Sequence, residues 1–167
     1  MLKEMVKRES LPKLKHIICI SILLVLDIAL KHLAVSNLDI NTYREFIPFI
    51  GFYLTTNSGI AFSLLDFNNF YTSYGLLIIG LVIVFFLFYL LNKEKSFIGQ
   101  TAFVFIIGGA IGNLFDRAMD GAVTDFLLLF FGNFSLFVFN PADFFITLGA
   151  IFFIANEIYV KKELSNI

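Results

Sequence analysis

Four stretches of the chain are long and apolar enough to cross a lipid bilayer as single helices. The hydrocarbon core of a bilayer is about 30 Å thick, so a spanning helix needs about 20 mainly apolar residues. The strands of a membrane β-barrel would give segments of about 10 residues with alternating polarity, which these stretches lack. The sequence therefore predicts an all-α membrane protein with four spans, at about residues 17–35, 72–91, 97–115 and 141–160.

The amino-acid composition agrees with a membrane protein. Of the 167 residues, 59% are hydrophobic and 15% are charged, whereas soluble domains carry about 25% charged residues. We expect one integral membrane domain over residues 1–167. The single cysteine, Cys19, lies in the first predicted span, so an intramolecular disulfide is impossible. The formal net charge of -1 gives no indication of nucleic-acid binding.

The basic residues predict the orientation of the chain in the membrane. Four consecutive spans place both tails and the 92–96 connection on one side, and an excess of Lys and Arg marks the cytoplasmic side. We therefore expect both termini in the cytoplasm and the connections 36–71 and 116–140 on the outer face. The nine basic residues of these three segments, out of 12 in the chain, are Lys3, Lys7, Arg8, Lys13, Lys15, Lys93, Lys95, Lys161 and Lys162.

The N-terminus also has features of a secretory signal peptide. A basic head and an apolar run precede Ala34-Val35-Ser36, which is a pattern typical of a cleavage site. However, Asp27 and Lys31 interrupt the apolar run, and three further spans follow. These features favour a retained first span.

Both outward connections contain residues that favour β-structure. Residues 46–65 are rich in Phe, Ile, Tyr and Thr, with Asn57, Ser58 and Gly59 as turn formers, which indicates short strands around a tight turn. Two β-prone runs, "FLLLFF" and "FSLFVF", flank Gly132-Asn133 and indicate a hairpin. Both segments are apolar enough to lie on the membrane surface or over the helices.

Several polar residues lie within or beside the spans. Asp27 and Lys31 are four residues apart and share a helix face, so they can pair, although Lys31 could also extend its charge outward with Asp27 merely neutralising it. Gly108 and Gly112 are spaced for close helix contact. Asn113, Asp116 and Arg117 share the outer end of the third span, where they form either a functional cluster or a polar helix end.

Two aspartates are expected on the outer side, Asp125 in a predicted strand or turn and Asp143 at the start of the fourth span. Asp143 has an ordinary structural explanation, since Asn140 is a good N-cap, Pro141 suits the first helical position, and an acid in the first turn favours the helix dipole. Asp125 has no such explanation. From these residues alone, helix capping and catalysis remain equally open.

Five short motifs occur in order along the chain: "DIALK" at Asp27–Lys31, "TNSGIAF" from Thr56, "GNLFDR" from Gly112, "VTDF" from Val123 and "FNPAD" from Phe139. With the four spans, this set closely resembles the lipoprotein signal peptidases (signal peptidase II), which are bacterial intramembrane aspartyl proteases, over about residues 20–150. The resemblance implies that Asp125 and Asp143 are catalytic and that the 36–71 connection forms a small extracytoplasmic β-cradle. It further implies a set of substrate-binding and supporting residues: Asn57, Gly59, Asn113, Asp116, Arg117, Asn140, Asp27 and Lys31.

The reaction implied by the resemblance is hydrolysis of one peptide bond in a diacylglyceryl-prolipoprotein, on the N-terminal side of the lipid-bearing cysteine, at the outer face of the bacterial cytoplasmic membrane. We expect a monomer that contacts membrane lipid and needs no cofactor or metal, since neither His16 nor His32 lies near Asp125 and Asp143 in sequence. Ile28, Pro141 and Phe144 depart from the residues usual in the family and put the fine shape of the site in doubt. Two functions from other classes are the alternatives: a small proton- or cation-coupled transporter and a noncatalytic membrane assembly protein.

Overall fold

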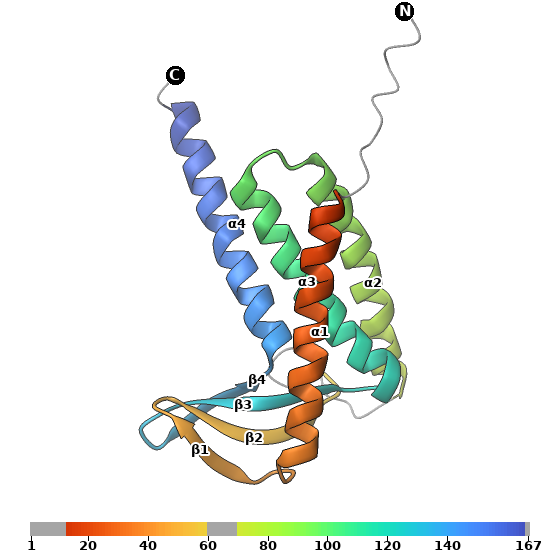
Figure 1. The fold of residues 1–167 in the computed structure, drawn as a ribbon, viewed down its shortest axis with the longest axis vertical. Coiled ribbons are helices and arrows are strands. Elements are labelled where there is room, and N and C mark those ends of the chain that lie inside the picture. Colours follow the sequence, from red (N-terminus) through yellow and green to blue (C-terminus); the bar gives the residue numbers. More distant parts are fainter. Residues whose placement is uncertain (1–12, 60–69, 166–167) are drawn as a thin grey trace, which may run out of the picture.

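The computed structural model describes residues 13–59 and 70–165 and confirms the predicted fold class (Figure 1). Four helices that are long and apolar enough to span a membrane pack side by side, and a four-stranded antiparallel sheet lies across one end of them. The basic residues before Lys13 and the 60–69 part of the first outward connection lie outside the described residues. The helices are α1 (Leu14–Asn37), α2 (Phe70–Lys93), α3 (Phe97–Asp120) and α4 (Pro141–Ser165).

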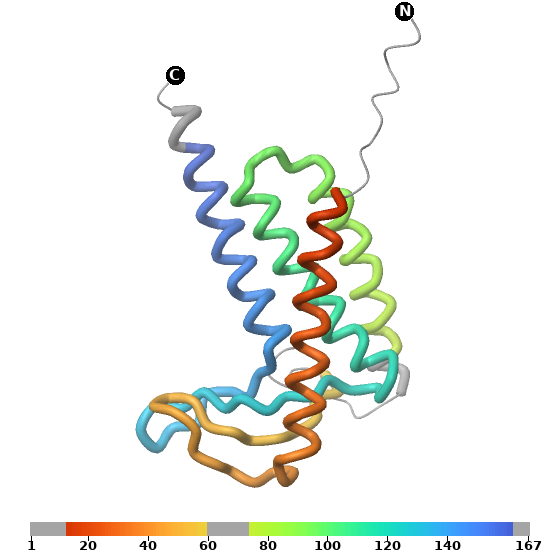
Figure 2. Tube along the Cα trace, in the orientation of Figure 1, coloured from red at the N-terminus to blue at the C-terminus, as the bar shows by residue number. Residues whose placement is uncertain are grey.

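The third helix is the centre of the bundle. Half of its most apolar window is buried, against 22% for α1 and 11% each for α2 and α4, and its path between the other helices is visible in Figure 2. Ile107 is fully buried and packs with Ile20 and Leu23 of α1 and with Val84 of α2. The outer faces of the bundle carry exposed apolar side chains, as expected where lipid is the solvent. Polar groups on α3 are therefore held inside the protein.

Glycines on α3 allow the neighbouring helices to approach closely, as the spacing of Gly108 and Gly112 predicts. A Cβ atom added at Gly108 would lie 2.8 Å from Leu23 Cδ1, and one at Gly112 would collide with the Asp27 carboxylate of α1. Gly109 similarly leaves room for the carbonyl of Ala142 at the start of α4. Small residues at helix contacts let backbones come together in membranes, and here they bring α1 and α4 against the same segment of α3.

The sheet takes two strands from each of the connections 36–71 and 116–140, which enlarges the β-cradle expected from residues 36–71 alone. Its order is β1-β2-β3-β4, and every neighbouring pair is antiparallel. The central pair, β2 with β3, joins the two connections. A two-stranded hairpin is marginally stable by itself, and pairing of the edge strands β2 and β3 combines the two hairpins into one four-stranded sheet. The strands are β1 (Tyr43–Ile47), β2 (Ile50–Asn57), β3 (Val123–Phe131) and β4 (Phe134–Phe139).

The turn of the first hairpin comes earlier than the predicted Asn57-Ser58-Gly59, and the strand expected after those residues, within 60–65, lies outside the described residues. The chain reverses at Pro48 and Phe49, and Asn57 is the last residue of β2 rather than part of the hairpin turn. Proline presets the backbone for a turn, and Phe49 takes a left-handed φ of 72° while its ring stacks on Phe131. The predicted Gly132-Asn133 turn is confirmed, with Gly132 at a φ of 58°.

Helix α3 is longer than the apolar stretch of about residues 97–115 from which the third span was predicted. The helix continues to Asp120 and ends where Gly121 adopts a left-handed φ of 72°. It can continue because the polar side chains of its last turns point into the protein: Asp116 pairs with Lys31, and Arg117 binds the carbonyl of Gly59. Hydropathy reports only the preference of a segment for lipid. The predicted end of the third span, at about residue 115, therefore comes several residues before the end of α3 at Asp120.

Candidate active site

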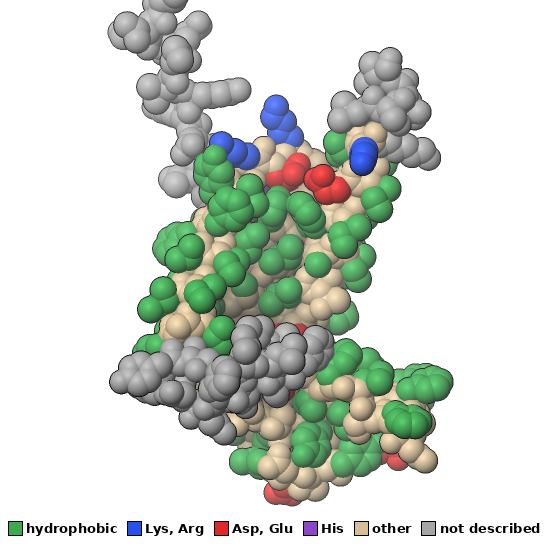
Figure 3. All heavy atoms as spheres, turned by 180° about the vertical axis from the view of Figure 1, so that it is seen from behind, with side chains coloured by type: hydrophobic (Ala, Val, Ile, Leu, Met, Phe, Trp, Pro, Cys, Tyr) green, Lys and Arg blue, Asp and Glu red, His purple; other side chains and the backbone are tan. Residues whose placement is uncertain are grey.

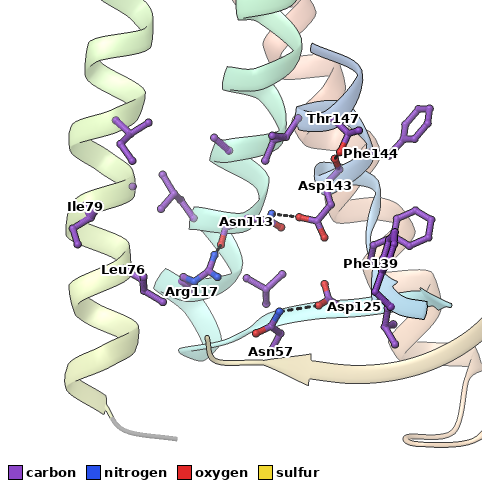
Figure 4. A pocket seen from close by; sticks show the side chains of 18 of the residues that line it. Asn57, Leu76, Ile79, Asn113, Arg117, Asp125, Phe139, Asp143, Phe144 and Thr147 are labelled. Carbon is purple, nitrogen blue, oxygen red and sulfur yellow. Dashed lines mark hydrogen bonds between the residues drawn. The ribbon is translucent and has the colours of Figure 1, made fainter. Parts of the chain in front are cut away.

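Asp125 and Asp143 come from different elements and line one cavity of about 870 Å³ between the sheet and helices α2, α3 and α4. Asp125 lies on β3, and Asp143 lies in the first turn of α4. Figure 4 shows both carboxylates pointing into the same space, with the side chains of Asn57, Asn113 and Arg117 around them. The two aspartates, 18 residues apart in sequence, therefore belong to one site.

The position of Asp125 is set by its strand. Thr55 of β2 pairs with Asp125 of β3, and the register continues to Asn57. This pairing lets Asn57 Nδ2 donate to Asp125 Oδ2 at 3.2 Å, while Asn140 Nδ2 donates to Asp125 Oδ1 at 2.6 Å. The side chain is 3% exposed. Both carboxylate oxygens thus have an amide donor in a nearly dry environment.

Burial is the main cause that raises the pKa of Asp125 from 3.8 to about 6, and the negative charge of Asp143 adds to it. The hydrogen bonds from Asn140 and Asn57 act in the opposite direction, as does the positive charge of Lys31. Desolvation and a nearby like charge both penalise the ionised form of a carboxyl. The two carboxyl groups consequently interact.

Asp143 both caps its helix and faces the cavity, so the two explanations open from sequence apply together. Asn140 Oδ1 accepts from Asp143 N at 3.0 Å, and Asp143 Oδ2 accepts from Asn140 N at 3.3 Å, which is a reciprocal capping box. The other oxygen, Asp143 Oδ1, accepts from Asn113 Nδ2 at 2.8 Å. Capping fixes the carboxyl group rigidly and leaves its other oxygen in the cavity.

Lys31 is buried inside the protein. The alternative in which its side chain extends outward is therefore wrong. Its side chain is 4% exposed, and Asp27 is fully buried. Lys31 Nζ lies 2.8 Å from Asp27 Oδ2, 2.9 Å from Asp116 Oδ2 and 3.2 Å from Asn113 Oδ1. The ammonium group thus has two ion-pair partners and one hydrogen-bond acceptor. The predicted Asp27–Lys31 pair is part of a larger network that includes α3.

Arg117 closes the site on the side of α2. Its Nη2 donates to the carbonyl oxygen of Gly59 at 2.8 Å, and its Nη1 lies 3.5 Å from the carbonyl oxygen of Asn113. The structure thus gathers every residue singled out from the motifs into one connected cluster around the cavity. Among the described residues, no group of three or more His, Cys, Asp and Glu side chains is arranged to hold a metal ion.

The apolar walls of the cavity could not be identified from the sequence. Leu76, Ile79 and Gly80 of α2 line it, with Phe139 of β4 and Phe144 of α4. Helix α2 is apolar on all faces, so its pattern does not distinguish a cavity-lining face from a lipid-facing one. Phe144, one of the departures from the family pattern, takes part in this wall, whereas Pro141 occupies the first helical position of α4 after the Asn140 cap.

Comparison with known proteins assigns this geometry to a family. The model of the family described as signal peptidase (SPase) II matches residues 19–159. The chain belongs to the signal peptidase II family. This assignment makes it a membrane protease and favours a peptidase over the transporter and the noncatalytic assembly protein.

Relatives and solved structures support the assignment. The lipoprotein signal peptidase of Mesorhizobium japonicum is 38% identical over 146 residues, which cover 86% of this chain and 85% of the relative. The lipoprotein signal peptidase of Bartonella bacilliformis is 41% identical over 147 residues, covering 85% and 87%. Two solved structures, each described as a bacterial membrane enzyme, have TM-scores of 0.72 and 0.74 at 28% and 26% identity. They cover 91% and 85% of this chain, and the chain covers 90% and 91% of them.

Proposed function

We propose that this member of the signal peptidase II family removes the signal peptide from diacylglyceryl-modified prolipoproteins by an aspartyl mechanism, cutting on the N-terminal side of the lipid-bearing cysteine. The observation that carries the proposal is the pair of buried aspartates, Asp125 and Asp143, in one cavity with apolar walls. Each carboxylate is held by side-chain amides from several elements. Such fixed geometry suits general acid–base chemistry on a peptide bond.

Two carboxyl groups that share a dry site retain one proton between them. The ionised group takes a proton from a water molecule as its oxygen attacks the scissile carbonyl. The neutral group donates a hydrogen bond to the carbonyl oxygen as negative charge develops there. When the tetrahedral intermediate collapses, the C–N bond breaks and the leaving nitrogen takes up a proton from the pair, which restores the one-proton state. The raised pKa of Asp125, about 6, favours retention of that proton by the pair in the free protein.

The cavity walls support a lipid-modified substrate. Leu129, Phe137 and Phe139 of the sheet face Leu76 and Ile79 of α2 across the cavity. A peptide lying between them would keep its carbonyl at the aspartates while its acyl chains remain in the bilayer. The lipid would then contribute binding free energy close to the reacting bond.

The distribution of charge supports an outward-facing site. On the face seen in Figure 3, the basic side chains gather at the end of the bundle remote from the sheet. Lys93 and Lys95 lie in and after the last turn of α2, and Lys161 lies near the end of α4. By the positive-inside rule this end faces the cytoplasm, so the sheet and both aspartates face outward.

The proposal is tested with purified protein in detergent or lipid. Prolipoprotein with and without the diacylglyceryl group is incubated with wild type, Asp125→Asn, Asp143→Asn and the double variant, and cleavage is followed by a gel shift. We expect wild type to cleave the lipid-modified substrate far faster. Each single variant should lose cleavage, and the double variant should be scarcely worse, because groups that act as a unit have non-additive effects.

Two outcomes would contradict parts of this proposal. Equal cleavage of both substrates by wild type would indicate a general protease. Substantial cleavage by folded Asp143→Asn would exclude the aspartyl pair, because asparagine can still accept from Asn140 N in the capping box and should cost no more than about 1 kcal/mol of stability. Asp120→Asn, at an exposed position at the end of α3, is the matched control and should retain full activity.

A further inference from the structure

The two acidic partners of Lys31 each bind one backbone amide next to an aspartate of the proposed pair. Asp27 Oδ1 accepts from Ala142 N at 2.9 Å, and Ala142 immediately precedes Asp143. Asp116 Oδ2 accepts from Thr124 N at 3.1 Å, and Thr124 immediately precedes Asp125. The same relation therefore occurs twice, once on α4 and once on β3.

One ammonium group connects these two contacts. Lys31 Nζ binds Asp27 Oδ2 at 2.8 Å and Asp116 Oδ2 at 2.9 Å, so a continuous path of polar contacts runs from Ala142 N through the lysine to Thr124 N. All three side chains are nearly or fully buried. In a dry environment such contacts are strong and geometrically restrictive.

The same lysine also orients an amide that reaches the pair. Lys31 Nζ donates to Asn113 Oδ1 at 3.2 Å, which obliges the amide nitrogen of Asn113 to point the other way, where it donates to Asp143 Oδ1 at 2.8 Å. Gly112 makes the arrangement possible, because a Cβ atom there would overlap the Asp27 carboxylate.

We propose that Lys31, Asp27 and Asp116 are positioning residues that set the separation of Asp125 and Asp143 by holding the amide before each of them. The inference rests on the proposed function only in treating these two aspartates as one catalytic pair. The path links α4 to β3 through the ionic cluster, so the spacing of the two carboxyl groups depends on that cluster. Because these contacts also satisfy buried backbone amides, a role in stability alone would lower the folded fraction and leave kcat per folded molecule unchanged.

The test compares alanine and asparagine at the two acidic positions. Asp27→Asn and Asp116→Asn lose the charge but can still accept from Ala142 N or Thr124 N, whereas Asp27→Ala and Asp116→Ala lose both. The matched control is Asn156→Ala, which breaks the buried 2.6 Å bond from Ser96 Oγ at the opposite end of the bundle. Wild type and all variants are purified, the folded fraction is measured, and kcat and KM are determined per folded molecule with lipid-modified prolipoprotein.

We expect kcat to fall at least tenfold in each alanine variant with KM within twofold of wild type, and to be largely restored in the asparagine variants. Asn156→Ala should keep the kcat of wild type even if its thermal stability falls as far as that of the Asp27→Ala and Asp116→Ala variants. The basic limb of the pH–rate profile should also lie at lower pH in each alanine variant than in its asparagine counterpart, because separated carboxyl groups share a proton less well. Among the described residues, the charged groups nearest the pair are Arg117, which lines the cavity, and the Lys31, Asp27 and Asp116 cluster, and the asparagine variants control for the lost charges.

Unchanged kcat in folded Asp27→Ala and Asp116→Ala would overturn the inference, as would a rise in KM alone, which would indicate substrate contact. Failure of the proposed function is distinguishable, because it would appear as absence of cleavage by wild type. In that case the titration of the aspartate carboxyl carbons, followed by 13C NMR in the same alanine and asparagine variants, still tests the spacing. Identical titration of the pair in all variants would refute the positioning role.

Discussion

Replacement of Asp125 by asparagine should change the pH dependence of stability in a direction set by its environment. The folded protein raises the pKa of this carboxyl from 3.8 to about 6, through burial first and the charge of Asp143 second. A carboxyl with a raised pKa favours the folded state while protonated. Its contribution is therefore fully present below pH 3.8, is lost between about pH 4 and 6, and is absent above pH 6.

The size of this loss follows from the same values. A pKa that rises from 3.8 to about 6 on folding corresponds to about 3 kcal/mol of differential stability. The asparagine side chain cannot ionise, so the variant escapes this loss. It does lose one hydrogen bond, because a single amide oxygen cannot accept from both Asn57 and Asn140, and this costs about 1 kcal/mol at every pH. Asp125→Asn should thus be less stable than wild type at about pH 4 and more stable at about pH 7.5.

The assay is thermal inactivation of the fold in detergent at both pH values. Since the chain has no Trp and its single Cys is exposed, the protein that remains monodisperse after heating is measured by size-exclusion chromatography. The difference in Tm between variant and wild type should rise by about 6–12 °C between the lower and the higher pH, and Asp120→Asn should show no such change. A difference in Tm between Asp125→Asn and wild type that does not change with pH would contradict the raised pKa of Asp125.

Three further predictions concern the pair, the helix packing and the topology. The basic limb of kcat/KM should lie near pH 6 and move to higher pH in Asn57→Ala, because the hydrogen bond from Asn57 lowers the pKa of Asp125; a shift to lower pH would contradict this. Gly149→Leu should lower Tm by several degrees, because even its Cβ would lie 2.7 Å from the carbonyl oxygen of Ala102, and an unchanged melt would disprove the close α3–α4 contact. In a background without the native cysteine, Asp120→Cys should react with an impermeant thiol reagent in intact cells and Lys95→Cys should not; the reverse pattern would invert the topology.

The spans and the second hairpin could be predicted because each is encoded by local pattern. About 20 apolar residues can satisfy their backbone groups in lipid only as a helix, and the Gly132-Asn133 pair between two β-prone runs specifies a tight turn. The motif order likewise indicated the family before any geometry was known. These signals are contained within single segments of the chain.

The exact ends of the helices and the pairing of the hairpins depend on contacts between residues that are far apart in the sequence. Helix α3 extends to Asp120 because Asp116 and Arg117 find partners on α1 and at Gly59. The joining of β2 to β3 depends on two connections that are far apart in sequence. Hydropathy measures the affinity of a segment for lipid, and it contains no term for a partner elsewhere in the fold.

The sequence by itself determined that two aspartates lie in the fourth span and in the connection before it and that a charge pair lies in the first span, but only the tertiary structure decided what they contact. Sequence could not distinguish a cap from a cavity group at Asp143, and the fold makes it both, with one oxygen on Asn140 N and the other on Asn113. Nor could it show that Lys31 binds Asp116 as well as Asp27. The physical reason is that a buried charge must be satisfied by whichever polar groups the packing of several helices brings within hydrogen-bond distance.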